Sequence, residues 1–230
     1  MVALMCGIHW NKKISGMGIG VERNGERKAG TLTRNDWIEA AKAILVSKGI
    51  RDLGLRRLAT TLNVTTGAFY YQFKNFEELH AAVLQHWEET NGCEVGNVLK
   101  NKQLSAEERY LSYVRILFNN ELLDPSYDGA IREWARSSED VSRALKRVDA
   151  LRLQQFFELF LDLGLSETAA EVRAHLIYFH QIGYYLVEYS ETRKERLKRI
   201  PYYAELFCPG LIPIDIGVRE LEKIILGDMD

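Results

Sequence analysis

Glu171, His175 and His180 are the side chains whose types and spacing come nearest to a metal site. Glu171 and His175 are four residues apart, so on a helix they lie on one face, as two metal ligands would. His180 is five residues beyond His175 and points elsewhere, and no third ligand follows at a suitable spacing. We therefore expect a solvated or hydrogen-bonded pair at this position, and we predict no metal and no other cofactor.

The sequence carries no motif for catalysis. It contains no Ser-His-Asp order, no GxSxG, no HExxH, no glycine-rich phosphate loop and no paired-carboxylate motif. We predict no catalytic residues and no enzyme activity. The alternative is a helical-bundle small-molecule-binding protein or enzyme that does not bind DNA, and turnover without DNA binding would favour it.

Cysteine usage and hydropathy bear on the compartment. Cys6, Cys93 and Cys208 are far apart and form no CxxC pair, which fits a reducing cytoplasm. No apolar run approaches the roughly 20 residues that a membrane span needs. Residues 1–8 lack the preceding basic residues of a secretory signal, and Met17 is an alternative start. We expect a cytoplasmic protein without membrane contact.

The charge is distributed unevenly along the chain. Residues 1–75 hold 12 Lys and Arg against 5 Asp and Glu, whereas the remaining residues hold 18 against 27. A basic head on an acidic body is the asymmetry expected when only the head meets a polyanion.

Hydrophobic periodicity predicts the elements that position these groups. From Thr33 onward, apolar residues recur at three- and four-residue spacing, with Thr33 as the expected cap and Gly49 as the stop of the first helix. No stretch alternates with period two, so we expect an all-α protein. The further helices are predicted at residues 55–62, 66–72, 76–95, 105–121, 127–136, 139–163, 167–192 and 216–226. The predicted breaks are Asp124-Pro125, Ser137-Ser138, Gly164 and Pro201.

Residues 55–71 carry the pattern of two short helices joined by a tight turn. Ala59 is small enough for a close helix crossing, and Asn63 falls where a left-handed backbone is expected. Phe69 supplies an apolar contact between the helices, and Thr65 is expected to cap the second of them. The pattern predicts a helix-turn-helix whose second helix enters the major groove of DNA.

Residues 33–79 resemble the N-terminal domain of TetR-type repressors. The resemblance implies a three-helix DNA-binding domain with a helix-turn-helix, plus a larger helical-bundle domain for ligand binding and dimerisation. It also implies a homodimer that binds a palindromic double-stranded DNA operator. The expected domains are a flexible basic arm at 1–30, the DNA-binding domain at 31–78 and the body at 79–230. The matching residues are Ala40-Ala41, Gly49, Leu58-Ala59, Val64, Gly67, Phe69-Tyr70, Phe73 and Glu77-x-Leu79, with weaker matches in Asp124–Val148 and Pro201–Leu206.

The same resemblance implies a set of DNA contacts. Arg56 and Arg57 would reach backbone phosphates, which position the protein without reading sequence. Tyr70 would contact a phosphate, and Gln72 is a candidate phosphate or base contact. The groove-facing residues of the recognition helix would be Thr65, Thr66, Ala68 and Tyr71.

Phe76 departs from the family's pattern. The family usually has a lysine there that helps hold a phosphate, so Lys74 takes over this contact or the contact is missing. DNA affinity would then depend more on the basic arm. A head that no longer binds DNA, in an interaction protein, is the alternative that this residue leaves open.

The body is rich in aromatic residues, most of which we expect in the core or at a dimer interface. Helices 139–163 and 167–192 are expected to form a four-helix seam between protomers. The candidate interface residues are Phe156, Leu159, Phe179, Ile182 and Leu186. The candidate ligand contacts, chosen because their helices flank the family's pocket, are Tyr113, Trp134, His175 and Tyr178.

Together these features predict a sequence-specific DNA-binding transcriptional regulator, a repressor released by a small apolar or aromatic ligand. The ligand would favour a conformation in which the two recognition helices no longer match the ~34 Å spacing of successive half-sites. The helix over 76–95 would act as the lever between the two domains. Activation is the alternative to repression.

Overall fold

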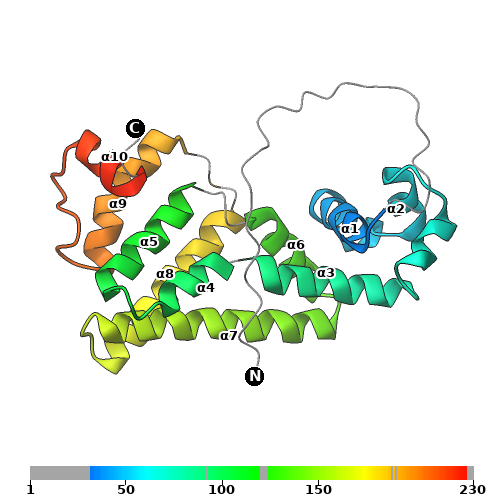
Figure 1. Cartoon of the computed structure of the whole chain (residues 1–230). Helices are drawn as coiled ribbons and strands as arrows, with labels where there is room; N and C mark the ends of the chain where they lie inside the picture. The colour runs from blue at the N-terminus through cyan, green and yellow to red at the C-terminus, as the bar shows by residue number, and fades with distance from the viewer. Residues whose placement is uncertain (1–31, 92, 120–123, 188, 190, 227–230) are drawn as a thin grey trace.

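The computed structural model describes residues 32–91, 93–119, 124–187, 189 and 191–226, and the expected arm lies outside them. Within these ranges every regular element is a helix, which confirms the all-α fold (Figure 1). The elements are α1 (Arg34–Lys48), η1 (Ile50–Asp52), α2 (Leu55–Thr61), η2 (Thr66–Tyr71), α3 (Phe76–Thr90), α4 (Cys93–Lys100), α5 (Ala106–Asn119), α6 (Pro125–Ala135), α7 (Glu139–Asp162), α8 (Glu167–Leu186), α9 (Arg193–Phe207) and α10 (Val218–Leu226); η marks a 3-10 helix.

The first helix begins and ends where its sequence predicts. The Thr33 hydroxyl accepts from the amide of Asp36, while the Asp36 carboxylate accepts from the amide of Thr33 at 2.7 Å. Gly49 ends the helix with a φ of 80°, a left-handed conformation that glycine adopts without strain. Both ends of α1 are therefore fixed by local sequence.

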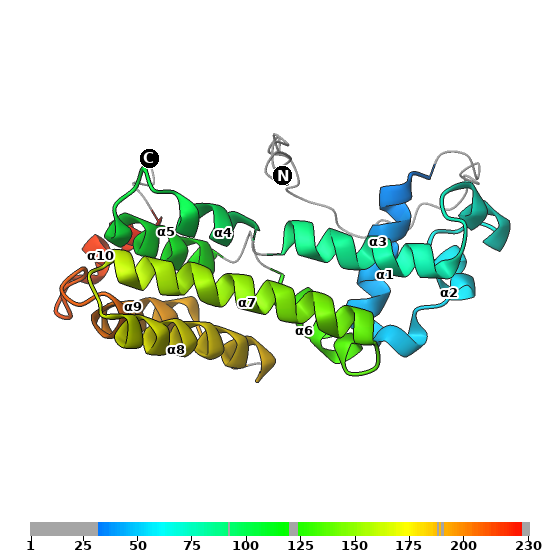
Figure 2. The same cartoon turned by 90° about the horizontal axis from the view of Figure 1, so that it is seen from below.

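The long helix α7 runs beneath the rest of the molecule (Figure 1). The view from below shows α8 lying alongside it, and α3, α4, α5 and α6 also pack on α7 (Figure 2). The helices α1 to α3 lie toward one end of α7, whereas α9 and α10 lie toward the other. This helix therefore connects the N-terminal part to the body.

Two buried hydrophobic clusters divide the interior. The first joins α1, α2, η2 and α3 to α6, with Trp37, Phe69 and Ile131 among its fully buried members. The second lies between α4, α5, α7, α8, α9 and α10. The core of the N-terminal part thus extends past residue 78 into α3 and α6, so those helices pack directly against the DNA-binding head.

The helix predicted over residues 76–95 is wrong as one element, because α3 ends at Thr90 and α4 begins at Cys93. Asn91 has an extended backbone, and its side chain donates a hydrogen bond to Asp128 of α6 at 2.8 Å. This contact between Asn91 and Asp128 lies at the C-terminal end of α3. The helix proposed as the lever between the two domains is therefore α3 alone, and the C-terminal end of α3 is attached to α6.

Pro201 is not the break that was predicted, since it lies inside α9. A proline inside a helix removes one backbone hydrogen bond, at a cost of about 3 kcal/mol. The apolar face of α9, including Leu197, Ala204 and Phe207, is buried in the second cluster. Burial of this face outweighs the local cost.

Candidate functional site

The turn between α2 and η2 has the geometry that the sequence predicts. Asn63 adopts a φ of 54°, and the amide of Val64 donates to the carbonyl of Ala59 at 2.9 Å. Ala59 is buried at the crossing. Phe69 packs edge-on against Trp37 of α1, with 5.4 Å between the ring centroids. The 3-10 helix η2 is therefore held against α1 by its buried side.

Thr65 does not cap η2 with its side chain, contrary to the prediction. Its carbonyl accepts from the amide of Ala68 at 3.1 Å, and the hydroxyl makes no capping bond. The Thr65 side chain is exposed instead.

Seven of the nine candidate DNA contacts are exposed side chains between residues 56 and 74. Tyr70 and Tyr71 are 62% and 80% exposed, which is unusual for large aromatic side chains. Ala68 is 3% exposed and belongs to the first core cluster, so its methyl group faces inward. We call the surface formed by these exposed side chains the η2 surface: Arg56, Arg57, Thr65, Thr66, Tyr70, Tyr71 and Lys74.

Two of the candidate contacts are held by other protein groups. Arg57 pairs with Asp52 at 2.5 Å. Gln72 is half-buried, and its Nε2 donates to the carbonyl of Leu32 at 2.9 Å, while its own carbonyl accepts from Arg34. The structure thus gives Gln72 a role in attaching the start of α1 to the end of η2.

Phe76 packs inward, where a lysine would face the solvent. Its ring lies 6.1 Å from that of Phe69 and 4.8 Å from that of His80, and His80 in turn lies 5.1 Å from Trp134. Burial lowers the pKa of His80, partly opposed by the charge of Glu77. The substitution therefore extends the core from the recognition element to α6.

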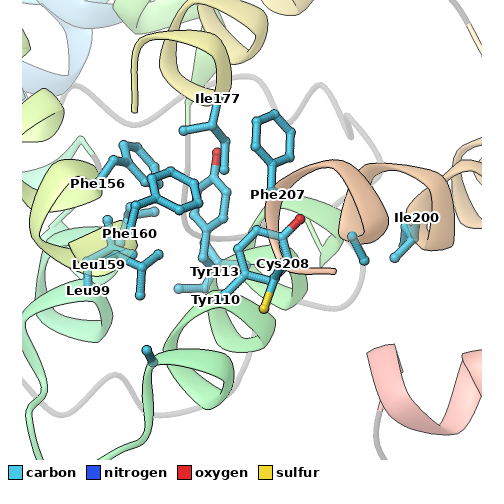
Figure 3. Close-up of a cluster of buried hydrophobic side chains, with 14 of the residues drawn as sticks. Leu99, Tyr110, Tyr113, Phe156, Leu159, Phe160, Ile177, Ile200, Phe207 and Cys208 are labelled. Carbon is cyan, nitrogen blue, oxygen red and sulfur yellow. The ribbon is translucent and has the colours of Figure 1, made fainter. Parts of the chain in front are cut away.

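The second part of the site is a pair of cavities in the body. The α5–α8–α9 cavity has a volume of about 80 Å³ and is lined by those three helices and Glu191. The junction cavity has a volume of about 60 Å³ and lies where α3, α4, α5, α6, α7 and α8 meet. Tyr113, Leu117 and Gln181 line both cavities. Figure 3 shows Tyr113 among the buried side chains beside Phe156 and Ile177.

The four candidate ligand contacts do not lie together. Tyr113 lines both cavities and Tyr178 lines the junction cavity. Trp134 is buried in the first core cluster against His80. His175 is half-buried with its ring 5.3 Å from that of the exposed Phe179, and it lines neither cavity.

A polar network borders the junction cavity, and sequence reasoning did not identify it. Asp128 accepts from Asn91 at 2.8 Å, from Arg132 at 2.8 Å and from Arg152 at 3.5 Å. Arg132 also pairs with Asp149 at 2.8 Å. The network joins the end of α3 to α6 and α7, so it connects the head to the cavity wall.

Asp149 extends this network to α8. It accepts from the hydroxyl of Tyr178 at 2.5 Å. Burial raises the pKa of Tyr178 to about 12, with the Asp149 hydrogen bond acting in the same direction. The i,i+4 spacing of Asp128 and Arg132 was the one signal in the sequence that could have indicated part of this network.

The candidate interface residues divide between the core and the surface. Phe156 and Leu159 are buried within the protomer, so they are not available to a partner in this conformation. Phe179 and Leu186 are 58% and 54% exposed, and Ile182 is half-buried. The exposed apolar residues that share α8 with them are Val172 and Leu176.

In the described ranges, no group of three or more His, Cys, Asp or Glu could hold a metal ion. In the same ranges, no helix combines the length and the apolar character needed to cross a membrane.

Residues 38–83 match the family model described as bacterial regulatory proteins, tetR family. The fold is similar to that of a TetR-family transcriptional regulator from Marinobacter aquaeolei, with a TM-score of 0.61 at 17% identity over 84% of this chain and 99% of that one. A TetR transcriptional regulator from Legionella pneumophila gives a TM-score of 0.56 at 17% identity, over 84% and 97% of the two chains. A putative transcriptional regulator from Pseudomonas aeruginosa gives a TM-score of 0.54 at 17% identity, over 89% of this chain and 95% of that one. No curated protein matches the chain.

The fold and the helix-turn-helix define a DNA-binding transcriptional regulator. Residues 38–83 thus match the N-terminal domain of the TetR-type regulators, and the all-helical fold of the chain is similar to that of solved regulators of this type.

Proposed function

We propose that the chain is a repressor that binds a palindromic operator as a homodimer and leaves it when a small ligand enters the body. The observation that carries the DNA-binding half of this proposal is the η2 surface. Two largely exposed tyrosines stand beside exposed threonines and cations, on an element whose other side is fixed in the core by Phe69. Hydroxyl groups and cations of this kind suit phosphates and base edges.

The cationic side chains of the η2 surface would supply the electrostatic attraction to the DNA backbone. Arg56, Arg57 and Lys74 would neutralise phosphates and so position the two tyrosines over the groove. Phe76 offers no charge at the position where the family has a lysine, so Lys74 is the proposed replacement. The basic segment over residues 1–30 would add further phosphate contacts.

The exposed face of α8 supports the dimer. Phe179, Leu186, Val172 and Leu176 together leave a large apolar surface uncovered on one helix. Soluble monomers seldom expose a contiguous surface of this kind. A two-fold axis through α8 would cover it with the same helix of a second copy.

The two cavities support ligand release without catalysis. The junction cavity touches Asn91 and Asp128, which join α3 to α6. A ligand there would shift that contact and so change the spacing of the two heads in the dimer. We infer a binding role in the cytoplasm, where the DNA is, and no enzyme activity.

A reporter assay tests the proposal. A promoter that contains the site bound by the purified protein drives a reporter, with and without the wild-type chain. Repression predicts lower expression with the wild type and restored expression with Tyr70→Ala/Tyr71→Ala, while Tyr202→Ala, a change at an exposed tyrosine of α9, behaves as the wild type. Higher expression with the wild type would show activation instead.

A further inference from the structure

A groove beside the η2 surface is lined by three arginines. Its walls come from η1, from the residues that begin α2 and from the first residue of η2, and they are Arg51, Asp52, Gly54, Leu55, Arg56, Arg57 and Thr66. The groove belongs to the DNA-binding head, because α2 lies at the end of the molecule away from α9 and α10 (Figure 1). Among its lining residues, Arg51 is the cation that does not belong to the η2 surface, and the sequence pattern did not indicate a role for it.

The positive charge of this groove is only partly neutralised. Arg57 pairs with Asp52 at 2.5 Å, and both side chains are close to half exposed. Arg51 and Arg56 are exposed, and neither side chain makes an ion pair or a hydrogen bond with a described residue. Three guanidinium groups against one carboxylate leave the lining residues with a net positive charge, so the groove attracts an anion.

The anion that this position suits is a phosphate of the DNA backbone. The groove is continuous with the η2 surface, because Arg56, Arg57 and Thr66 belong to both. A guanidinium binds a phosphate through two parallel hydrogen bonds, and a threonine hydroxyl can donate another. A phosphate in the groove would therefore belong to the same duplex that the η2 surface contacts.

The groove and Tyr71 lie at opposite ends of η2. Thr66 begins this 3-10 helix and lines the groove, whereas Tyr71 ends the helix and does not line the groove. The distance between these two residues along the helix axis is about 10 Å, at a rise of about 2 Å per residue. The major groove of B-DNA is ~12 Å wide and has one strand on each side. Cations at the two ends of η2 can therefore reach phosphates of two different strands.

We propose that Arg51 and Arg56 bind a phosphate of one DNA strand, while Lys74, beyond the other end of η2, binds the strand across the major groove. Asp52, through its pair with Arg57, lowers the positive charge of the groove and so limits its affinity for DNA of any sequence. This inference rests on the proposed function, because it assigns a second set of phosphate contacts to the same DNA-binding head.

The salt dependence of DNA binding tests whether Arg51 meets a phosphate. The full-length wild type and Arg51→Gln are titrated with a random-sequence duplex and with a duplex that the wild type selects, at about 50 to 200 mM salt. Loss of one phosphate contact is expected to reduce the slope of log affinity against log salt by about 0.9 per protomer bound, and to weaken binding of both duplexes by one common factor, roughly tenfold. The matched control is Arg219→Gln, at an exposed position of α10, and it should behave as the wild type. A slope that Arg51→Gln leaves unchanged would overturn the proposal.

Removal of the carboxylate in the groove should act in the opposite direction. Asp52→Asn leaves Arg57 without its ion-pair partner, so binding of both duplexes is expected to strengthen roughly threefold. The matched control is Asp215→Asn, at an exposed position outside the groove. Damage to the fold would weaken binding in either variant, so opposite effects of Arg51→Gln and Asp52→Asn identify an effect of charge. Equal or weaker binding by Asp52→Asn would overturn the role of Asp52.

Single uncharged phosphates in the selected duplex test the assignment to two strands. Each phosphate is replaced in turn by a methylphosphonate, and affinity is measured for the wild type, Arg51→Gln and Lys74→Gln. A replacement that weakens binding of the wild type but not of Arg51→Gln marks the phosphate that Arg51 contacts, and Lys74→Gln marks its own phosphate in the same way. The two phosphates are expected on opposite strands of one major groove. Two phosphates on the same strand would overturn the proposal.

The outcomes separate this inference from the proposed function. DNA binding that Arg51→Gln leaves unchanged overturns the second set of contacts, and the repressor proposal stands. Binding that depends on Arg51 without repression of the reporter supports the groove and contradicts the repressor proposal. A wild-type protein that binds neither duplex at any of these salt concentrations would overturn both.

Discussion

The side-chain amide of Asn91 donates to the carboxylate of Asp128 at 2.8 Å, and this bond ties the end of α3 to α6. Asp128 also holds Arg132 and Arg152, so one carboxylate links the head to the wall of the junction cavity. A displacement of α6 or α7 at the cavity would therefore shift the C-terminal end of α3 through these contacts.

Loss of the Asp128 charge is expected to destabilise the protein. Asp128→Asn leaves the partly buried Arg132 paired with Asp149 alone and removes the ion-pair partner of the partly buried Arg152, at an expected cost of about 1–3 kcal/mol after allowance for partial solvent exposure. Chemical denaturation measures this cost. Glu139→Gln, which alters an exposed ion pair with Arg143, should change stability by less than about 0.5 kcal/mol. An equally small effect of Asp128→Asn would contradict the role of the network.

Replacement of Phe76 by lysine is expected to lower the stability of the protein and to raise its affinity for DNA. Phe76→Lys removes ring contacts with Phe69 and His80, at a cost of about 1–2 kcal/mol, and adds one cation near the expected phosphate. The plot of log affinity against log salt should steepen by about one unit. Phe76→Leu is the control, since it loses ring contacts without gaining charge. Tighter DNA binding by both variants would refute the charge argument.

A charge on the exposed face of α8 is expected to separate the protomers. Phe179→Glu places a carboxylate in the surface that the second copy would cover, so sedimentation should give monomers and operator binding should weaken sharply. Tyr202→Glu alters a similarly exposed aromatic residue on α9 and should leave the dimer intact. A Phe179→Glu protein that remains dimeric would place the interface elsewhere.

Protonation of His80 is expected to weaken the head as the pH falls. Burial lowers the pKa of His80 in the folded state, so the unfolded chain binds the proton more readily. The stability that neutral His80 provides is complete above its unfolded pKa of about 6.5 and is lost as the pH falls through the lower folded value. The melting temperature should fall between pH 7.5 and 5.5, and it should fall less in His80→Phe. His180, whose pKa burial also lowers, acts in the same direction, and the matched comparison is His180→Phe.

Local sequence was sufficient to predict the elements whose ends are set by neighbouring residues. The capping of α1 by Thr33 and Asp36, the stop at Gly49 and the left-handed Asn63 all depend on interactions within a few residues. The contact of His80, beside Phe76, with Trp134 and the contact of Asn91 with Asp128 both depend on α6, which is distant in the sequence. Periodicity alone could not indicate these partners.

The candidate site residues show the same division between features set by neighbouring residues and features set by distant helices. A helical position indicates that a residue is on an apolar face, but not which neighbour covers that face. Tyr113 and Phe156 lie in one buried cluster, with 5.0 Å between their ring centroids, although one was predicted at a ligand site and the other at an interface. Gln181 carries no motif, and the two cavities that it lines exist only when α8 is assembled with α5 and the helices around them.

Selection of bound duplexes from a random DNA pool, at moderate salt, tests the central claim most directly. The wild-type protein is expected to recover a palindrome with two half-sites, and Thr66→Ala/Tyr71→Ala is expected to lose that sequence while retaining weak, salt-sensitive binding. Recovery of no common sequence by the wild type, or of the same palindrome by the double variant, would contradict sequence recognition by the η2 surface.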